Sequence, residues 1–368
     1  MTKFIKHLEN YNKGLLQLLF KLFVRNELIN PPIYSSNIDK ILLLRTDRIG
    51  DMAVSIPLIR LLKKRIPNLS IYIFASKINA PLIADDPDIS GVFIKQKNIF
   101  SILNQLLKIR KKGIDLSLNL NLNKSLTNAI LSHFAVPKGI KVASAYNDKY
   151  SNFYNCLIEI KRNNKIPMAL LLLKFLEMLN IHEIKSANNF ALYLSSFTNN
   201  IANELLKRVK LRNKKFIIFN ISSSHENRNT TDEFVIELLR GLFKRISEPI
   251  LLISDIAQQK RLHKIRQSIQ NIRLKILPAM DLQTLTAVIS KSEITITPDT
   301  AIVHIACGVN IPVAAFYTRE EQFYNEWQPV GVRSVSIFAK GNSHVSQIDP
   351  LKALEKIMQL YGEISANE

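Results

Sequence analysis

Short runs of apolar residues alternate with longer segments of helical periodicity from about residue 38 onward. The run Ile38–Arg45 is nearly all apolar, which is typical of a strand that is buried on both faces of a parallel sheet. The loop over 46–50 follows. Apolar residues then recur at three- and four-residue steps through Met52–Arg65, which predicts a helix. A strand, loop and helix in this order predict a βαβ unit.

The alternation continues in two series, separated by a mostly helical stretch over 163–212. In the first series we expect further strands at Leu69–Ala75, Gly91–Ile94, Leu116–Leu120 and Lys141–Ala143, and helices over 99–112 and 124–135. In the second series we expect strands at Phe216–Ile221, Ile250–Ser254, Leu274–Ile276, Ile294–Thr297 and Val313–Phe316, and helices at Thr231–Arg245, 257–270, Leu282–Ser290 and Ile302–Cys307. The pattern predicts an α/β protein with two doubly wound, Rossmann-like domains facing a cleft.

These two series suggest four parts of the chain. We expect an N-terminal extension over 1–36, a first domain over 37–185, an interdomain segment over 186–214, and a second domain over 215–368 that ends in a helix. Ligands in doubly wound folds bind beyond the carboxyl ends of the strands. The loops that follow the strands are therefore the places to look for chemistry.

The N-terminal extension contains a basic amphipathic pattern over 3–24. Its apolar positions fall on one helical face: Phe4, Leu8, Tyr11, Leu15, Leu18, Leu19 and Leu22. Lysines lie along and beside that face. Such a helix either lies in a membrane interface, with its cations on anionic headgroups, or packs on its own domain. No apolar run reaches the ~20 residues that a membrane-spanning helix needs.

Charge is the main compositional anomaly. The 368 residues include 50 Lys and Arg against 30 Asp and Glu, a net charge of +20. This surplus indicates an anionic partner, such as nucleic acid, anionic lipid or a phosphorylated small molecule, or else a generally lysine-rich composition. Cys156 and Cys307 are the only cysteines, which excludes a disulfide scaffold. The chain contains no glycine-rich nucleotide fingerprint, P-loop or metal-ligand spacing, so no metal site is predicted.

The first candidate loop is 46–51 (TDRIGD), directly after the first strand. Gly50 permits close approach of the backbone to another group. Asp51 has two interpretations. It is either a helix-start carboxylate, which favourably meets the positive end of the helix, or a general base for a hydroxyl group.

The second candidate loop is 222–231 (SSSHENRNTT), after the strand at Phe216–Ile221. Serine hydroxyls, among them Ser222 and Ser223, together with Arg228 beside a helix N-terminus can hold a phosphate. We expect Thr230 and Glu233 to form a capping box at the start of the next helix.

The third candidate loop is 297–300 (TPDT), with His304 one turn beyond Thr300 on the same helix face. The Asp299 carboxylate can accept hydrogen bonds from sugar hydroxyls. Backbone amides at the helix start, together with a neutral or protonated His304, can bind a diphosphate.

These motifs resemble glycosyltransferase family 9, the lipopolysaccharide heptosyltransferases. The stretch over 41–68 (ILLLRTDRIGDMAVSIPLIRLLKKRIPN) is similar to the family's opening strand, loop and helix, and 296–317 (ITPDTAIVHIACGVNIPVAAFY) is similar to its donor-site segment. The segment 115–125, which ends in Lys124 and Ser125, and the triplet 327–329 (WQP) also resemble the family. The pair of long motifs in this order is far more specific than either one alone.

The resemblance implies a GT-B architecture and inverting transfer of a heptose from ADP-heptose, with no metal or other cofactor. By this likeness Asp51 is the catalytic base, and the donor is bound by Ser222, Ser223, Arg228, Asp299, Thr300 and His304. Arg48, Lys124 and Ser125 are acceptor-side candidates.

The resemblance further implies a nucleotide sugar and the anionic core glycolipid of lipopolysaccharide as partners, and no nucleic acid. We then expect a cytoplasmic protein, peripherally bound to the inner leaflet of the inner membrane. Two alternatives stay open. One is a GT-B glycosyltransferase with a different nucleotide sugar, and the other is a non-catalytic protein that binds sugar nucleotides or membranes.

Overall fold

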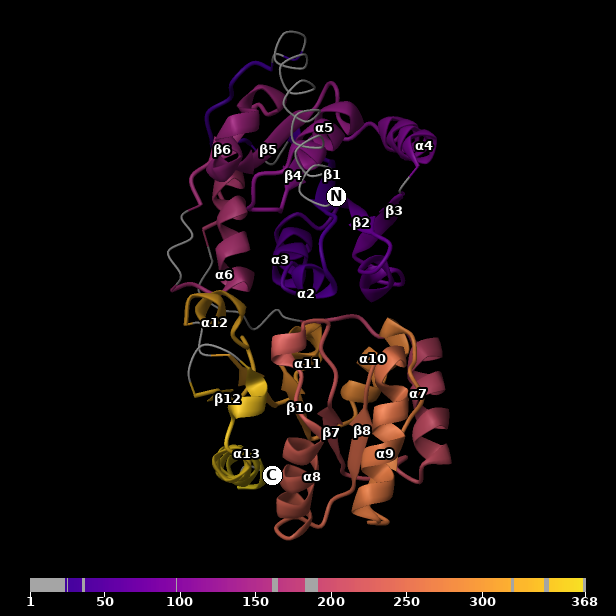
Figure 1. The fold of residues 1–368 in the computed structure, drawn as a ribbon. Coiled ribbons are helices and arrows are strands. Elements are labelled where there is room, and N and C mark those ends of the chain that lie inside the picture. The colour runs from indigo at the N-terminus through magenta and orange to yellow at the C-terminus, as the bar shows by residue number, and fades with distance from the viewer. Residues whose placement is uncertain are drawn as a thin grey trace, which may run out of the picture. The chain divides into compact units, whose positions relative to one another are not determined.

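The computed structural model describes residues 24, 26–34, 37–96, 98–160, 165–182, 191–318, 321–340 and 344–366. Apart from Val24, the predicted basic helix over 3–24 lies outside the described residues. The chain forms two compact units (Figure 1). The first comprises 1–48, 58–162 and 170–186, and the second comprises 49–57, 163–169 and 187–368.

The first unit contains a sheet of six parallel strands in the order β3-β2-β1-β4-β5-β6. The strands are β1 (Lys40–Arg45), β2 (Ser70–Ser76), β3 (Ile89–Lys95), β4 (Leu116–Asn119), β5 (Ile140–Ser144) and β6 (Cys156–Ile158). The five predicted strands are confirmed to within two residues at each end. The three-residue β6 was not predicted.

The second unit contains another sheet of six parallel strands, in the order β12-β11-β10-β7-β8-β9. The strands are β7 (Ile217–Asn220), β8 (Ile250–Ile253), β9 (Leu274–Ile276), β10 (Ile294–Pro298), β11 (Val313–Tyr317) and β12 (Ser334–Phe338). Counted from its own first strand, this sheet has the same order as the first, and it is the Rossmann order. The predicted α/β class is therefore confirmed.

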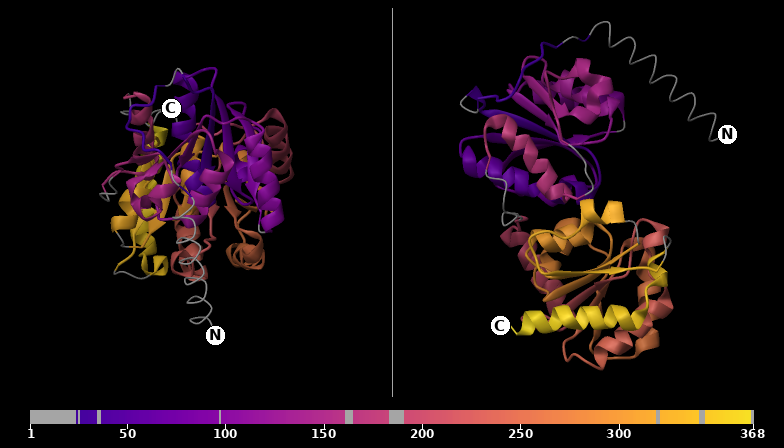
Figure 2. Two further views of the ribbon diagram at one scale, coloured as in Figure 1. Left: turned by 90° about the horizontal axis from the view of Figure 1, so that it is seen from above. Right: turned by 90° about the vertical axis from the view of Figure 1, so that its left-hand side faces the viewer.

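Helices connect the strands and cover the sheets. The α-helices are α2 (Ile49–Ala53), α3 (Ile56–Arg65), α4 (Ile99–Arg110), α5 (Leu126–Ala135), α6 (Met168–Leu172), α7 (Ser196–Arg208), α8 (Asp232–Phe243), α9 (Gln259–Ile269), α10 (Leu282–Ile289), α11 (Ala301–Gly308), α12 (Glu321–Trp327) and α13 (Pro350–Ser365). Short 3₁₀ helices lie at Ala80–Ile83, Ala145–Phe153, Leu173–Leu179, Glu226–Arg228, Ile256–Gln258 and Val345–Gln347. Figure 2 shows α13, in yellow, along the outside of the second unit, where it packs on α8 and β12.

The helix predicted over Met52–Arg65 is in fact two helices. A turn at Val54 and Ser55 separates α2 from α3. Pro57 lies at the second position of α3. It has no amide hydrogen to continue a helix from α2, and its ring restricts the preceding backbone. The Ser55 hydroxyl donates instead to the Asp51 carbonyl at 2.8 Å.

The predicted cap of the helix after the second loop also differs from the structure. Thr231, not Thr230, caps α8, since its Oγ1 accepts a hydrogen bond from the Phe234 amide at 3.2 Å. The segment 186–214, predicted to lie between domains, contains α7, which packs against α10.

Each sheet has its switch point between its two central strands, β1 and β4 in the first unit and β7 and β10 in the second. The chain leaves these neighbouring strands in opposite directions, so a crevice opens beyond their carboxyl ends. The predicted loops 46–51 and 222–231 follow β1 and β7, and the predicted loop 297–300 begins in the last two residues of β10.

An ion-pair cluster fixes the loop before β3 to helix α3. The Arg60 guanidinium binds both oxygens of the Asp86 carboxylate, at 2.8 and 2.5 Å, and also binds Asp88 at 2.7 Å. The Asp86 side chain is 2% exposed and that of Arg60 is 15% exposed. The pair of Arg60 and Asp86 therefore lies largely out of reach of solvent, whereas Asp88 is 30% exposed.

Replacing Arg60 by Met is expected to lower the free energy of unfolding by about 3 kcal/mol, because the Asp86 charge stays buried without its cation. Urea unfolding followed by circular dichroism measures this loss. The neighbouring Lys64→Met variant, in which an exposed lysine is replaced, serves as the control and should unfold within about 0.5 kcal/mol of wild type. Equal stability of the two variants would contradict the assigned role of the cluster.

Candidate functional site

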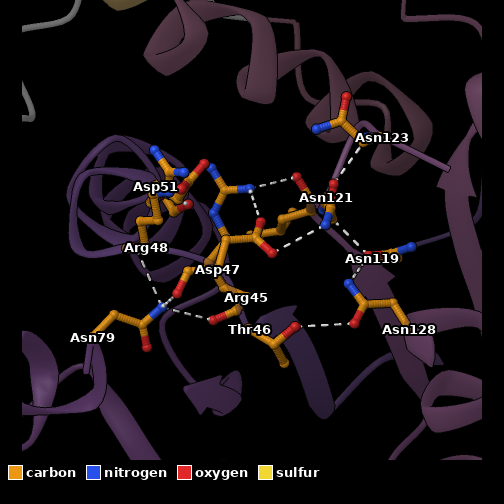
Figure 3. A network of polar contacts seen from close by, with 12 residues as sticks. Arg45, Thr46, Asp47, Arg48, Asp51, Asn79, Asn119, Asn121, Asn123 and Asn128 are labelled. Atoms are coloured by element: carbon orange, nitrogen blue, oxygen red, sulfur yellow. Dashed lines mark hydrogen bonds and ion pairs between the residues drawn. The ribbon is translucent and has the colours of Figure 1, made fainter. Parts of the chain in front are cut away.

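Polar side chains join the ends of the two central strands in the first unit (Figure 3). Arg45, the last residue of β1, donates to the Leu120 carbonyl just beyond β4 at 2.9 Å, and pairs with Asp47 at 3.3 Å. Asn121 donates to the other Asp47 oxygen at 3.0 Å. The loop after β1 is therefore tied across the switch point to the loop after β4.

Asn79 supports the same loop from the side of β2. This fully buried amide donates to the carbonyl oxygens of Arg45 at 3.0 Å and Asp47 at 3.2 Å. Its own oxygen accepts from the Ser76 amide at 2.9 Å. Hydrogen bonds thus hold the backbone that leads to Asp51 in one conformation (Figure 3).

The acceptor-side candidates flank this network. Arg48 lies exposed in the loop itself, and Lys124 is exposed just before α5. Ser125 is the N-cap of α5, with its hydroxyl accepting from the Asn128 amide at 3.2 Å. Asn128 in turn accepts from the Thr46 hydroxyl at 3.0 Å, so the start of α5 is joined to the loop after β1.

The segment 49–57 groups with the second unit, where α2 packs against α11. A Cβ atom on Gly50 would lie 3.3 Å from the His304 ring and 3.7 Å from the Ala301 backbone. Only a glycine permits this approach without a shift of its neighbours. Asp51 lies in the first turn of α2. Its negative charge acts on His304 and favours the protonated form of that side chain.

Asn220 organises the switch point of the second unit. It ends β7, is 1% exposed, and donates to the Thr297 hydroxyl at 3.0 Å and the Ser222 carbonyl at 2.9 Å. The Ser222 hydroxyl donates back to Asn220 and accepts from the Asp255 amide, both at 3.0 Å. The Ser223 hydroxyl accepts from the His225 amide at 3.2 Å. Both predicted serines therefore help to shape the loop.

Arg228 and Asp299 form an ion pair that joins the second and third loops. The guanidinium Nη1 lies 2.9 Å from the Asp299 carboxylate and also donates to the Asp299 carbonyl at 3.2 Å. The Asp299 side chain is 14% exposed. Burial raises the pKa of this carboxyl, and the positive charge of Arg228 acts in the opposite direction.

Helix α11 begins beside this ion pair. Thr300 is its N-cap, with Oγ1 accepting from the Ile302 amide at 3.3 Å. His304, one turn on, is 5% exposed. Burial lowers the pKa of His304 to about 4, although the negative charge of Asp51 acts to raise it. His304 is therefore neutral at neutral pH, and its ring lies 5.6 Å from that of Trp327.

Tyr317, at the end of β11, is a residue that sequence reasoning missed. Its hydroxyl is buried and has no hydrogen-bond partner among the described residues. Burial raises its pKa, and the charge of Asp299 acts in the same direction. Asn79, Asn121 and Asn220 were also missed. Asn220 does carry a readable signal, since it is the polar last residue of a strand next to the switch point.

The arrangement is suited to binding an anion and transferring a proton. Arg228 and the positive end of the α11 dipole supply positive potential, and Asp51 supplies a carboxylate. No group of three or more His, Cys, Asp or Glu side chains that could hold a metal occurs among the described residues.

Two Rossmann-like units, each with polar loops at its switch point, define a nucleotide-binding α/β class. Residues 107–357 match the model of glycosyltransferase family 9 (heptosyltransferase). The chain belongs to this family, as its motifs suggested.

Three proteins illustrate the similarity. The chain is 21% identical to lipopolysaccharide heptosyltransferase 1 of Campylobacter coli over 346 residues, which are 88% of this chain and 99% of that protein. The glycosyl transferase family 9 structure from Veillonella parvula has a TM-score of 0.76 at 15% identity, over 88% of this chain and 97% of that one. The E. coli ADP-heptose lps heptosyltransferase II has a TM-score of 0.70 at 17% identity, over 88% of this chain and 99% of that one. These structures share the fold, and the predicted GT-B class is confirmed.

Proposed function

We propose that this glycosyltransferase family member moves a heptose from ADP-heptose to the core oligosaccharide of a lipopolysaccharide, with inversion at the anomeric carbon. The observation that carries the proposal is the packing of α2 on α11. It places Gly50, the residue before Asp51, against the His304 ring, on the helix that begins next to the ion pair of Arg228 and Asp299. The name of the E. coli relative supports the choice of donor.

In this mechanism the acceptor hydroxyl loses its proton to Asp51 as its oxygen attacks the anomeric carbon. The bond from that carbon to the diphosphate breaks on the opposite face of the sugar, which inverts the configuration. Negative charge builds up on the departing ADP. Arg228 and the amides at the start of α11 stabilise this charge, so we expect the reaction to need no divalent cation.

The other residues bind and orient. His304 is neutral and therefore acts as a hydrogen-bonding group rather than as a cation. Thr300 and Asp299 lie where α11 begins, within reach of a sugar whose diphosphate is bound by that helix. Arg48 and Lys124 are exposed cations that suit a phosphorylated acceptor.

The acceptor class implies work at the cytoplasmic leaflet of the inner membrane, to which we propose the protein binds peripherally. The net charge of +20 fits an anionic lipid surface. Within the described ranges, no helix is both long and apolar enough to cross a membrane.

The test is a donor screen with purified, deacylated core oligosaccharide as acceptor. We expect ADP release with ADP-heptose, little release from UDP- or GDP-sugars, and unchanged rates in EDTA. NMR of the product should give the anomeric configuration opposite to that of the donor. Turnover with a UDP-sugar instead would assign the chain a different donor, and no turnover with any donor would overturn the catalytic proposal.

Asn79 is expected to act as a positioning residue for this reaction. Asn79→Ala removes three hydrogen bonds to the backbone that leads to Asp51, so kcat should fall by about 10-fold or more while the KM for the donor stays unchanged. Ser117→Ala is the control, since it removes a buried hydrogen bond within the same unit, between β4 and α5, without touching the loop. If both variants keep the same kcat, Asn79 has only a structural role.

A further inference from the structure

Helix α4 of the first unit is apolar on two sides. Its inner side carries Leu106 and Ile109, which are buried in the core of the unit, with Ile102 packed against them. Its outer side carries four large apolar residues that are exposed: Ile99 by 62%, Phe100 by 75%, Leu103 by 49% and Leu107 by 55%. A helix on the surface of a globular protein ordinarily turns polar residues outward.

The exposed residues form a continuous stripe rather than scattered positions. Ile99, Leu103 and Leu107 are spaced four residues apart, and Phe100 is three residues before Leu103, so all four share one helix face. Of the twelve exposed large apolar residues among the described residues, four are on this one helix. We call these four residues the α4 stripe.

The charged residues of α4 and of the turn after it are all positive. Between residues 98 and 114 the chain has no Asp or Glu, and it has four cations: Lys108, Arg110, Lys111 and Lys112. All four are exposed and lie at or just beyond the C-terminal end of α4. An apolar stripe with cations beside it is the pattern of helices that lie in the interface of anionic membranes.

We propose that the α4 stripe docks into the headgroup region of an anionic bilayer, with the phosphate groups of the lipids on the adjacent lysines. The helix lies at the outer edge of the first unit (Figure 1), so the stripe is carried by one projecting helix. The four cations, with no acidic residue on α4 itself, favour a lipid surface over a protein partner, whose binding face would have to supply the matching negative charge.

This inference rests on the proposed function, because a membrane-embedded acceptor gives the docking its purpose. It is independent of the predicted helix over 3–24, since it uses only residues of α4 and the turn after it. Two membrane contacts on one chain would add, because the second binds at the high local concentration set by the first.

Vesicle binding of the full chain tests the proposal. We expect the Phe100→Ser/Leu107→Ser double variant to bind vesicles of phosphatidylcholine mixed with phosphatidylglycerol about 10-fold or more weakly than wild type, because two large side chains no longer enter the interface. The Lys108→Glu/Lys111→Glu variant should lose the preference for these vesicles over pure phosphatidylcholine.

A matched control is available in the second unit. Ile256 and Ile272 are 83% and 80% exposed and lie outside any such stripe, so Ile256→Ser/Ile272→Ser should bind vesicles as wild type does. Equal urea midpoints for the variants and wild type would show that folding is intact.

Two results would overturn the proposal. One is unchanged vesicle binding in the Phe100→Ser/Leu107→Ser variant. The other is a wild-type dimer that this variant dissociates while vesicle binding stays the same, which would assign the stripe to an interface between copies of the chain.

Activity separates this inference from the proposed function. The variant should keep wild-type turnover with a deacylated, soluble acceptor and lose turnover only when the acceptor is embedded in vesicles. If wild type fails with both acceptors, the proposed function is wrong, and the vesicle-binding result still decides on the α4 stripe.

Discussion

Asp51→Asn is expected to lower kcat by about 10²–10⁴-fold, the range that a positioned general base contributes. The amide has nearly the same shape as the carboxylate but cannot accept the acceptor's proton. Binding of ADP, measured by isothermal titration calorimetry, should stay unchanged, because Asp51 is assigned to the acceptor hydroxyl and not to the nucleotide.

Asp39→Asn provides the control for this variant. Asp39 is exposed just before β1, and its replacement removes the same charge from the chain without altering the loop 46–51. We expect wild-type kcat for it. An Asp51→Asn enzyme with wild-type turnover would leave Asp51 as the helix-start carboxylate that its place in the first turn of α2 also allows.

Arg228→Met is expected to weaken the binding of ADP about 10–100-fold, which corresponds to the loss of one charged hydrogen bond worth about 1.5–3 kcal/mol. Titration calorimetry with ADP measures this loss. Arg240→Met, which removes an exposed arginine from α8 of the same unit, is the control and should bind ADP as wild type does. Unchanged affinity in Arg228→Met would exclude contact between this guanidinium and the diphosphate.

The same variant should make stability more dependent on pH. Burial already raises the pKa of Asp299 above its unfolded value, so its ionisation favours the unfolded chain, and the contribution of this group to stability falls as the pH rises. Without Arg228 the pKa rises further. The difference in unfolding free energy between wild type and Arg228→Met should therefore be larger at about pH 7 than at about pH 4.

The sequence was sufficient to predict which loops lie at the ends of the central strands, because buried parallel strands have an unmistakable apolar pattern. That these loops bind the ligand stays a prediction from the fold, since doubly wound folds bind ligands at the carboxyl ends of their strands. Each of the three loops singled out follows a central strand of its sheet. The break between α2 and α3 was also readable in principle from Pro57. Its signal was outweighed by the continuous apolar periodicity of the segment.

The pairings within the site could not be predicted. Arg228 and Asp299 lie on different loops, and no local pattern shows that one side chain neutralises the other. Asn79 looks like an ordinary loop residue until its amide is seen to bind the backbone after β1. Hydrogen bonds between residues far apart in sequence depend on the packed fold, and local propensity carries no trace of them.

The position of the central strands has a consequence for how the protein is made. In each sheet the first strand to leave the ribosome ends up in the middle, since β1 pairs with β4 and β7 pairs with β10. Ile41 cannot pair until Leu116 has been translated, and Ile217 cannot pair until Ile294 has been translated. During synthesis each unit therefore carries an apolar strand with one open edge while the intervening chain is translated. Such an edge invites pairing with other chains, so we expect nascent chains truncated before β4 or before β10 to depend on chaperones for solubility.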